Sequence, residues 1–182
     1  MSTELSLPLT VLAQHLGEQL LAAGEQVSTA ESCTGGGIAE AITRIAGSSA
    51  WFEVGFVTYS NQQKTRVLQV AEGDLQRDGA VSQSVVEGMV RGAQCLSGAR
   101  YAVAVSGVAG PGGGSVEKPV GTVWLAWADG EQVQSGRWHF AGDRDAVRQQ
   151  TVQAALAGLL CLIEGHEAAA WQQWLNKHLP NQ

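Results

Sequence analysis

The sequence predicts a single α/β domain, built on a mixed, mostly parallel sheet with helices on both faces and an antiparallel hairpin near the C-terminal part. Three observations support this prediction. The 182 residues suffice for one domain with a full hydrophobic core. Helical and strand patterns alternate through the first two-thirds of the chain. Two β-rich runs at 122–128 and 132–140 then flank Asp129-Gly130, a dipeptide typical of hairpin turns.

Helix and strand patterns alternate in the first sixty residues. Leucines at helical spacing, followed by a glycine stop, predict an opening helix over about 9–24. A short β-type run at 26–30 and a triple glycine at 35–37 then lead into a helical pattern over 38–45. Aromatic and β-branched residues predict a second strand over 51–59.

Capping signals place the next two helices. Asn61 is expected to cap a helix that carries Lys64. Ser84 begins an S-x-x-E capping box, and the apolar helical run behind it reaches about Leu96. The following run at 101–105 predicts a fully buried strand.

The C-terminal part predicts two more helices. Asp143 can cap a long helix over about 144–163, and Gly165 ends it. We expect a domain over residues 1–165 and a helical tail over 166–182. An apolar stripe in that tail is expected to pack against the domain or to form a subunit contact. Its residues, before a stop at Pro180, are Trp171, Trp174, Leu175 and Leu179.

Composition excludes several classes of protein. Seventeen acidic against 11 basic residues give a net charge of −6 and a pI near 5.1, which argues against a nucleic-acid partner. No run of 18 apolar residues occurs and no basic flank precedes an apolar N-terminus, so we expect a cytoplasmic protein without a membrane partner. Three widely spaced cysteines disfavour disulfides and structural zinc, and no metal or cofactor is expected. Charged residues make up only 15%, and such a low surface charge is compatible with self-association into a homo-oligomer.

The first candidate for chemistry runs from Thr29 to Gly37, with Ser32, Cys33 and Thr34 between a strand and a helix. N–H groups and the positive end of a helix dipole would stabilise an oxyanion or a phosphate there. The simpler explanation is an N-cap hydroxyl and a plain glycine turn. The segment has neither the G-x-S-x-G elbow nor the P-loop pattern. Without an evident histidine, Cys33 is expected to be a buried packing residue rather than a nucleophile.

The second candidate is Lys64, which follows the expected strand by a few residues and could point back across the end of the sheet. A lysine desolvated near a serine can lose its proton and act as a general base. The alternative is a solvated surface lysine. The histidines at positions 15, 139, 166 and 178 all lie away from the serine-rich and glycine-rich segments, so a Ser-His-Asp arrangement has few candidates for its base.

Two further candidates come later in the chain. The stretch from Ser106 to Thr122 is rich in glycine and follows a buried strand, so its backbone N–H groups could approach a ligand. A flexible hairpin connection is the alternative, although the length of the stretch favours a site. Arg144 falls in the first turn of a long helix, where a cation is unfavourable without an anionic partner. A ligand phosphate would be such a partner, and so would Asp143 or Asp145.

Five segments stand in order along the chain: Thr29–Gly36, Phe56–Asn61, Ser106–Gly114, Glu117–Trp124 and Gly142–Arg144. Together they closely resemble the CinA C-terminal domain family, which includes stand-alone bacterial nicotinamide mononucleotide deamidases. The resemblance covers about residues 8–163. Many members carry this domain behind a larger one similar to molybdopterin-binding proteins. No such segment precedes Met1, so an activity of that domain, such as pyrophosphate cleavage, is not expected.

The resemblance implies a metal-independent amidohydrolase. It would convert the carboxamide of nicotinamide mononucleotide to nicotinate mononucleotide and ammonia, in pyridine nucleotide salvage. Ser32 would be the nucleophile and Lys64 its general base, and Tyr59 would orient the pair or relay the proton.

The resemblance also implies the binding residues. Backbone N–H groups from Cys33 to Gly36 would bind the oxyanion, with help from the Thr34 hydroxyl. The glycine loop from Ser106 would line the ribose-phosphate site, and Arg144 would take the phosphate charge. Ser48 is a further candidate for the site. The other expected substrate contacts are Gly35, Ser49, Asn61, Gly107, Gly110 and Gly112.

Two other functions remain open from the sequence. The same pocket could belong to a nucleotide-binding accessory module in competence or DNA-damage responses, without catalysis. The acidic balance and the serine–lysine set argue against that function. The enzyme could also act on another nucleotide amide, which the shape of the pocket would decide.

Overall fold

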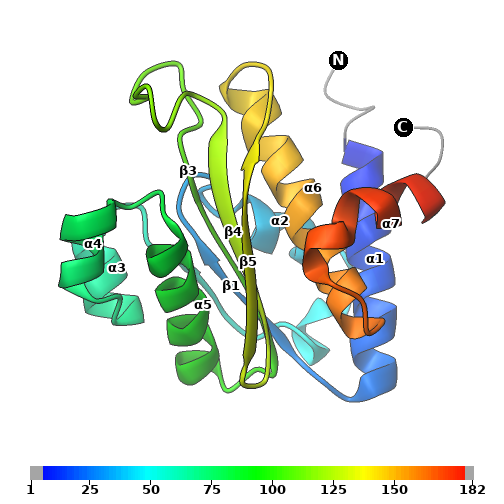
Figure 1. Cartoon of the computed structure of the whole chain (residues 1–182). Helices are drawn as coiled ribbons and strands as arrows, with labels where there is room; N and C mark the ends of the chain where they lie inside the picture. Colours follow the sequence, from blue (N-terminus) through cyan, green and yellow to red (C-terminus); the bar gives the residue numbers. More distant parts are fainter. Residues whose placement is uncertain (1–5, 179–182) are drawn as a thin grey trace.

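The computed structural model describes residues 6–178, with side chains from 9 to 177, and this part of the chain forms a five-stranded sheet between two layers of helices (Figure 1). The strand order is β2-β1-β3-β4-β5. The strands are β1 (Val27–Glu31), β2 (Gly55–Val57), β3 (Tyr101–Gly107), β4 (Thr122–Asp129) and β5 (Gln132–His139).

The sheet is mixed, as predicted. Strands β2, β1 and β3 run parallel, whereas β4 and β5 pair antiparallel with their neighbours and form the predicted hairpin. Parallel pairings equal antiparallel ones in number rather than exceeding them, because the chain turns back through the loop 108–121 without a crossover helix.

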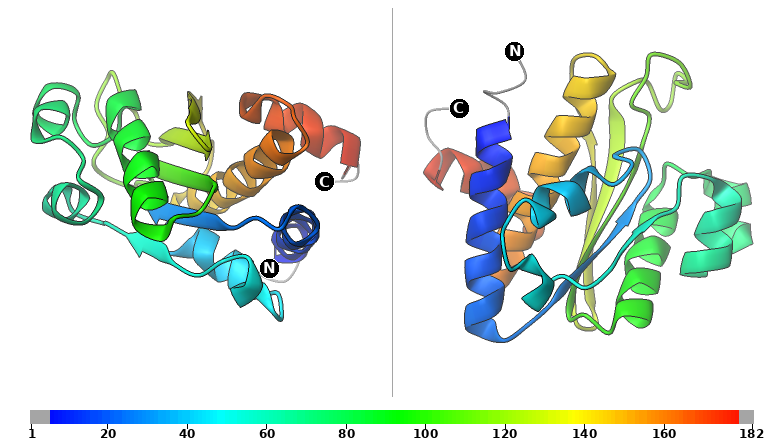
Figure 2. Two further views of the ribbon diagram at one scale, coloured as in Figure 1. Left: turned by 90° about the horizontal axis from the view of Figure 1, so that it is seen from below. Right: turned by 180° about the vertical axis from the view of Figure 1, so that it is seen from behind.

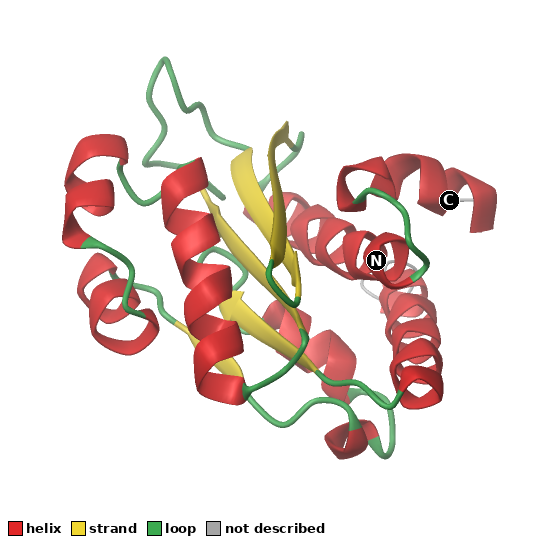
Figure 3. Ribbon diagram, turned by 60° about the horizontal axis from the view of Figure 1, so that its bottom comes forward, coloured by secondary structure: helices red, strands yellow, loops and turns green. Residues whose placement is uncertain are grey.

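Helices cover both faces of the sheet (Figures 2 and 3). One face carries α1 (Ser6–Ala23), α2 (Gly37–Thr43), α6 (Arg144–Ile163) and α7 (Trp171–His178). The other carries α5 (Gln83–Ser97), with α3 (Asn61–Leu68) and α4 (Glu72–Asp78) beside it. Two 3₁₀ turns, η1 (Ser48–Ala50) and η2 (Ala168–Ala170), complete the described elements.

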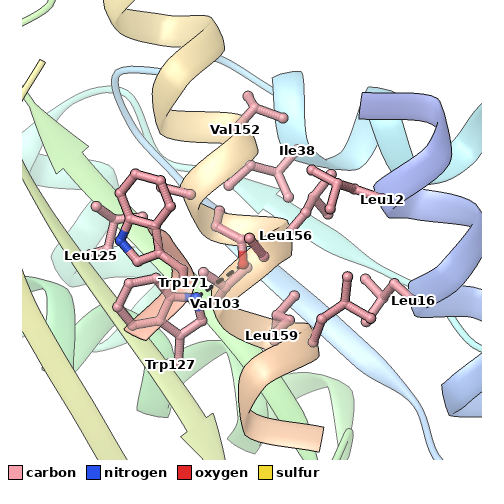
Figure 4. Close-up of a cluster of buried hydrophobic side chains, with 14 of the residues drawn as sticks. Leu12, Leu16, Ile38, Val103, Leu125, Trp127, Val152, Leu156, Leu159 and Trp171 are labelled. Atoms are coloured by element: carbon pink, nitrogen blue, oxygen red, sulfur yellow. Dashed lines mark hydrogen bonds between the residues drawn. The ribbon is translucent and has the colours of Figure 1, made fainter. Parts of the chain in front are cut away.

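A large hydrophobic cluster fills the space between the sheet and α6, and we call it the α6 cluster (Figure 4). Leu12, Ile38 and Leu156 bring α1, α2 and α6 together in it. Trp127 of β4 is fully buried there, and its indole N–H donates to the carbonyl of Ala155 at 3.0 Å. A buried indole thus keeps its hydrogen bond within an otherwise apolar layer.

A smaller cluster, the α5 cluster, lies on the opposite face of the sheet. Alternation along β3 places Ala102 and Ala104 on this face and Val103 on the other. Alanines of β1 and β4 extend the same small-residue face, so α5 lies close to the sheet. Leu68 at the end of α3 also belongs to this cluster, which fixes α3 beside α5.

Three local features differ from the sequence expectations. Ser60, not Asn61, caps α3, and its hydroxyl accepts the N–H of Gln63 at 3.3 Å. Ser82, not Ser84, precedes α5, because the Ser84 hydroxyl donates to Asp78 instead. Strand β2 has only three residues, since η1 and a buried Trp51 take up the chain before it. Helix α4 was not predicted.

The C-terminal segment packs against the domain. Trp171 and Trp174 are buried in the α6 cluster, and the Trp174 indole donates to Glu164 at 2.8 Å. Within the described residues these side chains therefore serve intramolecular packing, whereas Leu179 and Pro180 lie outside that part of the chain. Among the described helices, only α6 is long and apolar enough to cross a membrane, and 67% of its apolar window is buried inside the domain.

Candidate active site

The candidate site lies at the carboxyl ends of β1 and β3. The chain leaves β1 on the α6 side of the sheet and returns to β3 from the α5 side, so the two ends form a topological switch point where α/β sheets bind ligands. Ser32 directly follows β1, and its N–H donates to the carbonyl of Val105 on β3 at 3.1 Å. The serine is thereby fixed to the two central parallel strands.

Lys64 meets Ser32 from the opposite face of the sheet. Its Nζ lies 2.9 Å from Ser32 Oγ and 2.8 Å from the carbonyl oxygen of Thr58. The lysine is 1% exposed, although it stands on a short helix near the surface. Capping by Ser60 and the burial of Leu68 hold α3 at its two ends, which fixes the lysine between them.

Burial changes the protonation chemistry of this pair. Desolvation lowers the pKa of the Lys64 ammonium from 10.5 to about 8, so a neutral amine is accessible close to neutral pH. Desolvation raises the pKa of the neighbouring Cys33 thiol to about 12. The thiol therefore keeps its proton under conditions in which the lysine can lose its own, which favours a serine nucleophile over a cysteine.

The turn after Ser32 is organised around a buried carboxylate. Glu31, the last residue of β1, is 0% exposed and accepts the N–H groups of Gly36, Ile38 and Ala39 at 2.8–3.1 Å. It also accepts the Thr34 hydroxyl at 2.6 Å. Glu31 thus caps α2 from a distant position, since the helix has no side-chain cap of its own.

This arrangement leaves two of the expected oxyanion donors available. The Gly35 N–H donates to the carbonyl of Ser32 and the Gly36 N–H to Glu31. Within the described residues, the N–H groups of Cys33 and Thr34 donate to no protein acceptor. Because Glu31 also offsets the positive helix end, the expected effect of the α2 dipole on an oxyanion is small here.

Two arginines of α6 reach across to the site. Arg144 donates to the carbonyl of Gly110 and to the hydroxyl of Tyr59, both at 2.8 Å. Arg148, one turn further on, donates to the carbonyl of Thr34 at 2.9 Å. Helix α6 therefore joins the serine turn, the glycine loop and the end of β2. Tyr59 is 60% exposed, and its described hydrogen bond is the one to Arg144.

The glycine loop follows β3 at the same end of the sheet. Ser106 is buried and Gly107 half-buried at the end of β3, whereas Gly112 lies exposed in the loop. The loop is anchored at a distance, because Lys118 Nζ donates to the carbonyl of Asp78 at 2.5 Å. Gly107 has no room for a side chain, since a Cβ there would overlap Val123 and the backbone beside it.

Ser49 does not belong to this group, which corrects the sequence expectation. It is exposed in η1 next to Trp51, whose carbonyl accepts the N–H of Val27 at the first residue of β1. Ser32 follows the opposite end of that strand, which places the two serines roughly 17 Å apart along β1. Ser48 lies in the same turn, at that end of the sheet. Asn61 is exposed at the start of α3, at the correct end of the sheet.

The roles of two residues of the site, Glu31 and Arg148, were not predicted from the sequence. Glu31 stands inside a motif that was recognised, but its role depends on N–H groups up to eight residues away. Arg148 lies one helical turn after Arg144, and that spacing was a usable signal that both point to one side. The described residues contain no group of three His, Cys, Asp or Glu side chains that could hold a metal ion.

Fold and site together define an α/β domain with a buried serine–lysine pair at the carboxyl edge of its sheet. Residues 9–163 match the CinA C-terminal domain. The chain belongs to this family.

Curated relatives and solved structures agree with this membership. The chain is 70% identical over 155 residues to "Nicotinamide-nucleotide amidohydrolase PncC" of Pseudomonas putida, covering 85% of this chain and 97% of the relative. It is 52% identical over 169 residues to the protein of the same name from Escherichia coli K12, covering 92% and 95%. The crystal structure of the competence/damage inducible protein CihA from Agrobacterium tumefaciens is similar with a TM-score of 0.83 at 45% identity, over 85% of this chain and 95% of that one.

Proposed function

We propose that this protein hydrolyses the carboxamide of nicotinamide mononucleotide to nicotinate mononucleotide and ammonia, with Ser32 as nucleophile and Lys64 as general base. The observation that carries the proposal is the 2.9 Å hydrogen bond between Lys64 Nζ and Ser32 Oγ, made by a lysine that is 1% exposed. The names of the curated relatives supply the substrate.

The first half of the reaction forms an acyl-enzyme. The neutral Lys64 amine takes the Ser32 hydroxyl proton as Oγ attacks the carboxamide carbon. The N–H groups of Cys33 and Thr34 stabilise the resulting oxyanion, a contribution of about 3 kcal/mol for one such donor. The tetrahedral intermediate then collapses, the C–N bond breaks, and the Lys64 ammonium returns the proton to the departing ammonia.

The second half of the reaction hydrolyses the nicotinoyl ester on Ser32. Lys64, neutral again, takes a proton from water, whose oxygen attacks the ester carbon. Collapse of the second tetrahedral intermediate breaks the bond to Ser32 Oγ, which recovers the proton from Lys64. Nicotinate mononucleotide leaves, and both catalytic residues are back in their starting states.

The phosphate of the substrate is assigned to Arg144. Its guanidinium has donors beyond those that hold Gly110 and Tyr59, and guanidinium groups bind phosphate through several parallel hydrogen bonds. The glycine loop supplies backbone N–H groups to the ribose phosphate, with Ser106, Gly107 and the exposed Gly112 along it. We assign Tyr59 the task of orienting Arg144, in place of the orienting or proton-relay role at Ser32 and Lys64 that the resemblance implied, because its hydroxyl accepts from the Arg144 side chain.

The proposed active site also suggests where the catalytic domain ends. We assign residues 1–165 to the amidohydrolase domain and 166–182 to a helical tail that supports α6 through its tryptophans. A cytoplasmic location agrees with a nucleotide substrate drawn from the intracellular pool.

The test is ammonia release from the purified full chain with a chelator present. Nicotinamide mononucleotide is compared with free nicotinamide and with the intact dinucleotide. We expect release from the mononucleotide alone, loss of release in Ser32→Ala, and normal release in the matched variant Ser135→Ala, a serine that instead donates to Glu87 on the α5 face. A folded protein that releases no ammonia from the mononucleotide refutes the proposal.

A further inference from the structure

We propose that Glu31 is the positioning residue of the site: its carboxylate fixes the turn 32–36 so that the N–H groups of Cys33 and Thr34 stay free to bind the oxyanion. The inference rests on the proposed function in so far as that reaction passes through an oxyanion. It adds a residue whose carboxylate hydrogen-bonds to residues 34–39 rather than to Ser32, and which acts on the rate through the turn.

The first argument is the cost of burying this side chain. Glu31 is 0% exposed, and none of the ion pairs among the described residues includes it. A carboxylate in such a position is unfavourable unless several donors compensate it. Here one hydroxyl and three backbone N–H groups do so, and all four come from residues 34–39.

The second argument is which donors are engaged and which are not. Both carboxylate oxygens are occupied: one accepts from Thr34, Gly36 and Ile38, the other from Ala39. These contacts bend the chain back onto β1 directly after the nucleophile. In many hydrolases the N–H that follows the nucleophile is part of the oxyanion hole, and Cys33 occupies that position here.

The third argument is that the turn is held from outside as well. Arg148 donates to the carbonyl of Thr34 from α6, and the Gly37 N–H donates to the same carbonyl at 3.2 Å. The Thr34 peptide is therefore fixed by its side chain on Glu31 and by its carbonyl on Arg148. These anchors fix the Thr34 side chain and the planar peptide that follows it, so the peptide that carries the Thr34 N–H is restricted to rotation about the N–Cα bond of Thr34.

The experiment compares four variants of the full chain, with kcat and KM measured on nicotinamide mononucleotide. Glu31→Gln keeps the size and removes the charge. We expect kcat to fall about 100-fold or more, as when an oxyanion donor is removed, with KM changed less than about threefold. Glu40→Gln is the matched control, since this exposed carboxylate of α2 pairs with Arg44 on the surface of the helix, and it should stay within about twofold.

Thr34→Val and Thr34→Ser test the same contact with little change in volume. The valine variant lacks the hydroxyl that Glu31 accepts and should lose about tenfold in kcat, whereas serine should restore most of it. This pair also decides the matter if Glu31→Gln fails to fold. A folded Glu31→Gln with kcat within about threefold of wild type, or equal rates in the two Thr34 variants, would overturn the proposal.

A second readout separates this proposal from the proposed function. The rate at which a fluorophosphonate labels Ser32 depends on the oxyanion site and requires no nucleotide. If the wild-type protein releases no ammonia from the mononucleotide, the proposed function fails, and labelling still tests Glu31. Slower labelling of Glu31→Gln than of Glu40→Gln supports the positioning role, and equal rates in the folded variants contradict it.

Discussion

Replacing Lys64 with methionine should abolish turnover and yet stabilise the protein at neutral pH. Burial lowers the pKa of Lys64 from 10.5 to about 8, so at pH 7 the folded protein holds a charge that water would solvate better. At about 1.4 kcal/mol per pH unit, this difference costs the fold roughly 3 kcal/mol.

Methionine has a similar length and carries no charge. It loses the hydrogen bonds that Nζ makes to Ser32 and to the carbonyl of Thr58, each worth about 1 kcal/mol. The expected net gain in the free energy of unfolding at pH 7 is therefore about 1 kcal/mol.

The stability that Lys64→Met gains over the wild type should decrease as the pH rises. Between pH 8 and 10.5 the unfolded chain binds a proton at Lys64 that the folded chain does not, so wild-type stability rises with pH across this window. The advantage of Lys64→Met should shrink by roughly 2–3 kcal/mol between pH 7 and pH 10, which makes it the less stable protein at the higher pH.

Urea unfolding followed by tryptophan fluorescence at the two pH values measures this difference, since Trp127 is fully buried. Lys177→Met, at an exposed lysine of α7, serves as the control and should show no pH-dependent difference. The reasoning is refuted if Lys64→Met is less stable at pH 7 by the same amount as at pH 10.

Four other outcomes are expected. Ser32→Ala should bind nicotinate mononucleotide by calorimetry and turn over at background, while Cys33→Ala should retain turnover in the ammonia assay. The kcat/KM of the wild type should rise about tenfold per pH unit below pH 8 and level off above it, because the buried amine must be neutral. Arg144→Gln should raise KM for the mononucleotide about tenfold or more and leave KM for the phosphate-free riboside unchanged. Gly92→Ala should lose about 2 kcal/mol or more in urea unfolding, because its Cβ would overlap the backbone of α3, whereas Gly73→Ala, which has open space, should be neutral or stabilising.

Local patterns were sufficient for much of the fold. The cap at Asp143 is confirmed by a 2.9 Å bond from the N–H of Ala146, because the signal lies within three residues. The same kind of signal failed at Asn61 and Ser84: Ser60 caps α3 with its hydroxyl, and Ser82 occupies the N-cap position of α5 without a side-chain cap bond. Residue type alone could not decide between adjacent polar side chains.

The site was predictable only up to its long-range contacts. Family motifs brought Ser32 and Lys64 to attention, and the expectation that both stand near strand ends agrees with the structure. The function of Glu31 was not visible, because a glutamate at the end of a buried strand has no local signature for a helix cap five residues away. Ser49 was misplaced because proximity in sequence to the motifs was taken as proximity in space.

The serine and the lysine are supported by different hydrophobic clusters. Cys33, next to the serine, belongs to the α6 cluster, whereas Leu68 anchors the lysine helix in the α5 cluster. A core substitution on either side of the sheet can therefore change the spacing of the pair without touching it. Selection for turnover would then act on both clusters together, so neither could change its packing independently of the other. A small packing change in either cluster would lower activity before it lowered stability.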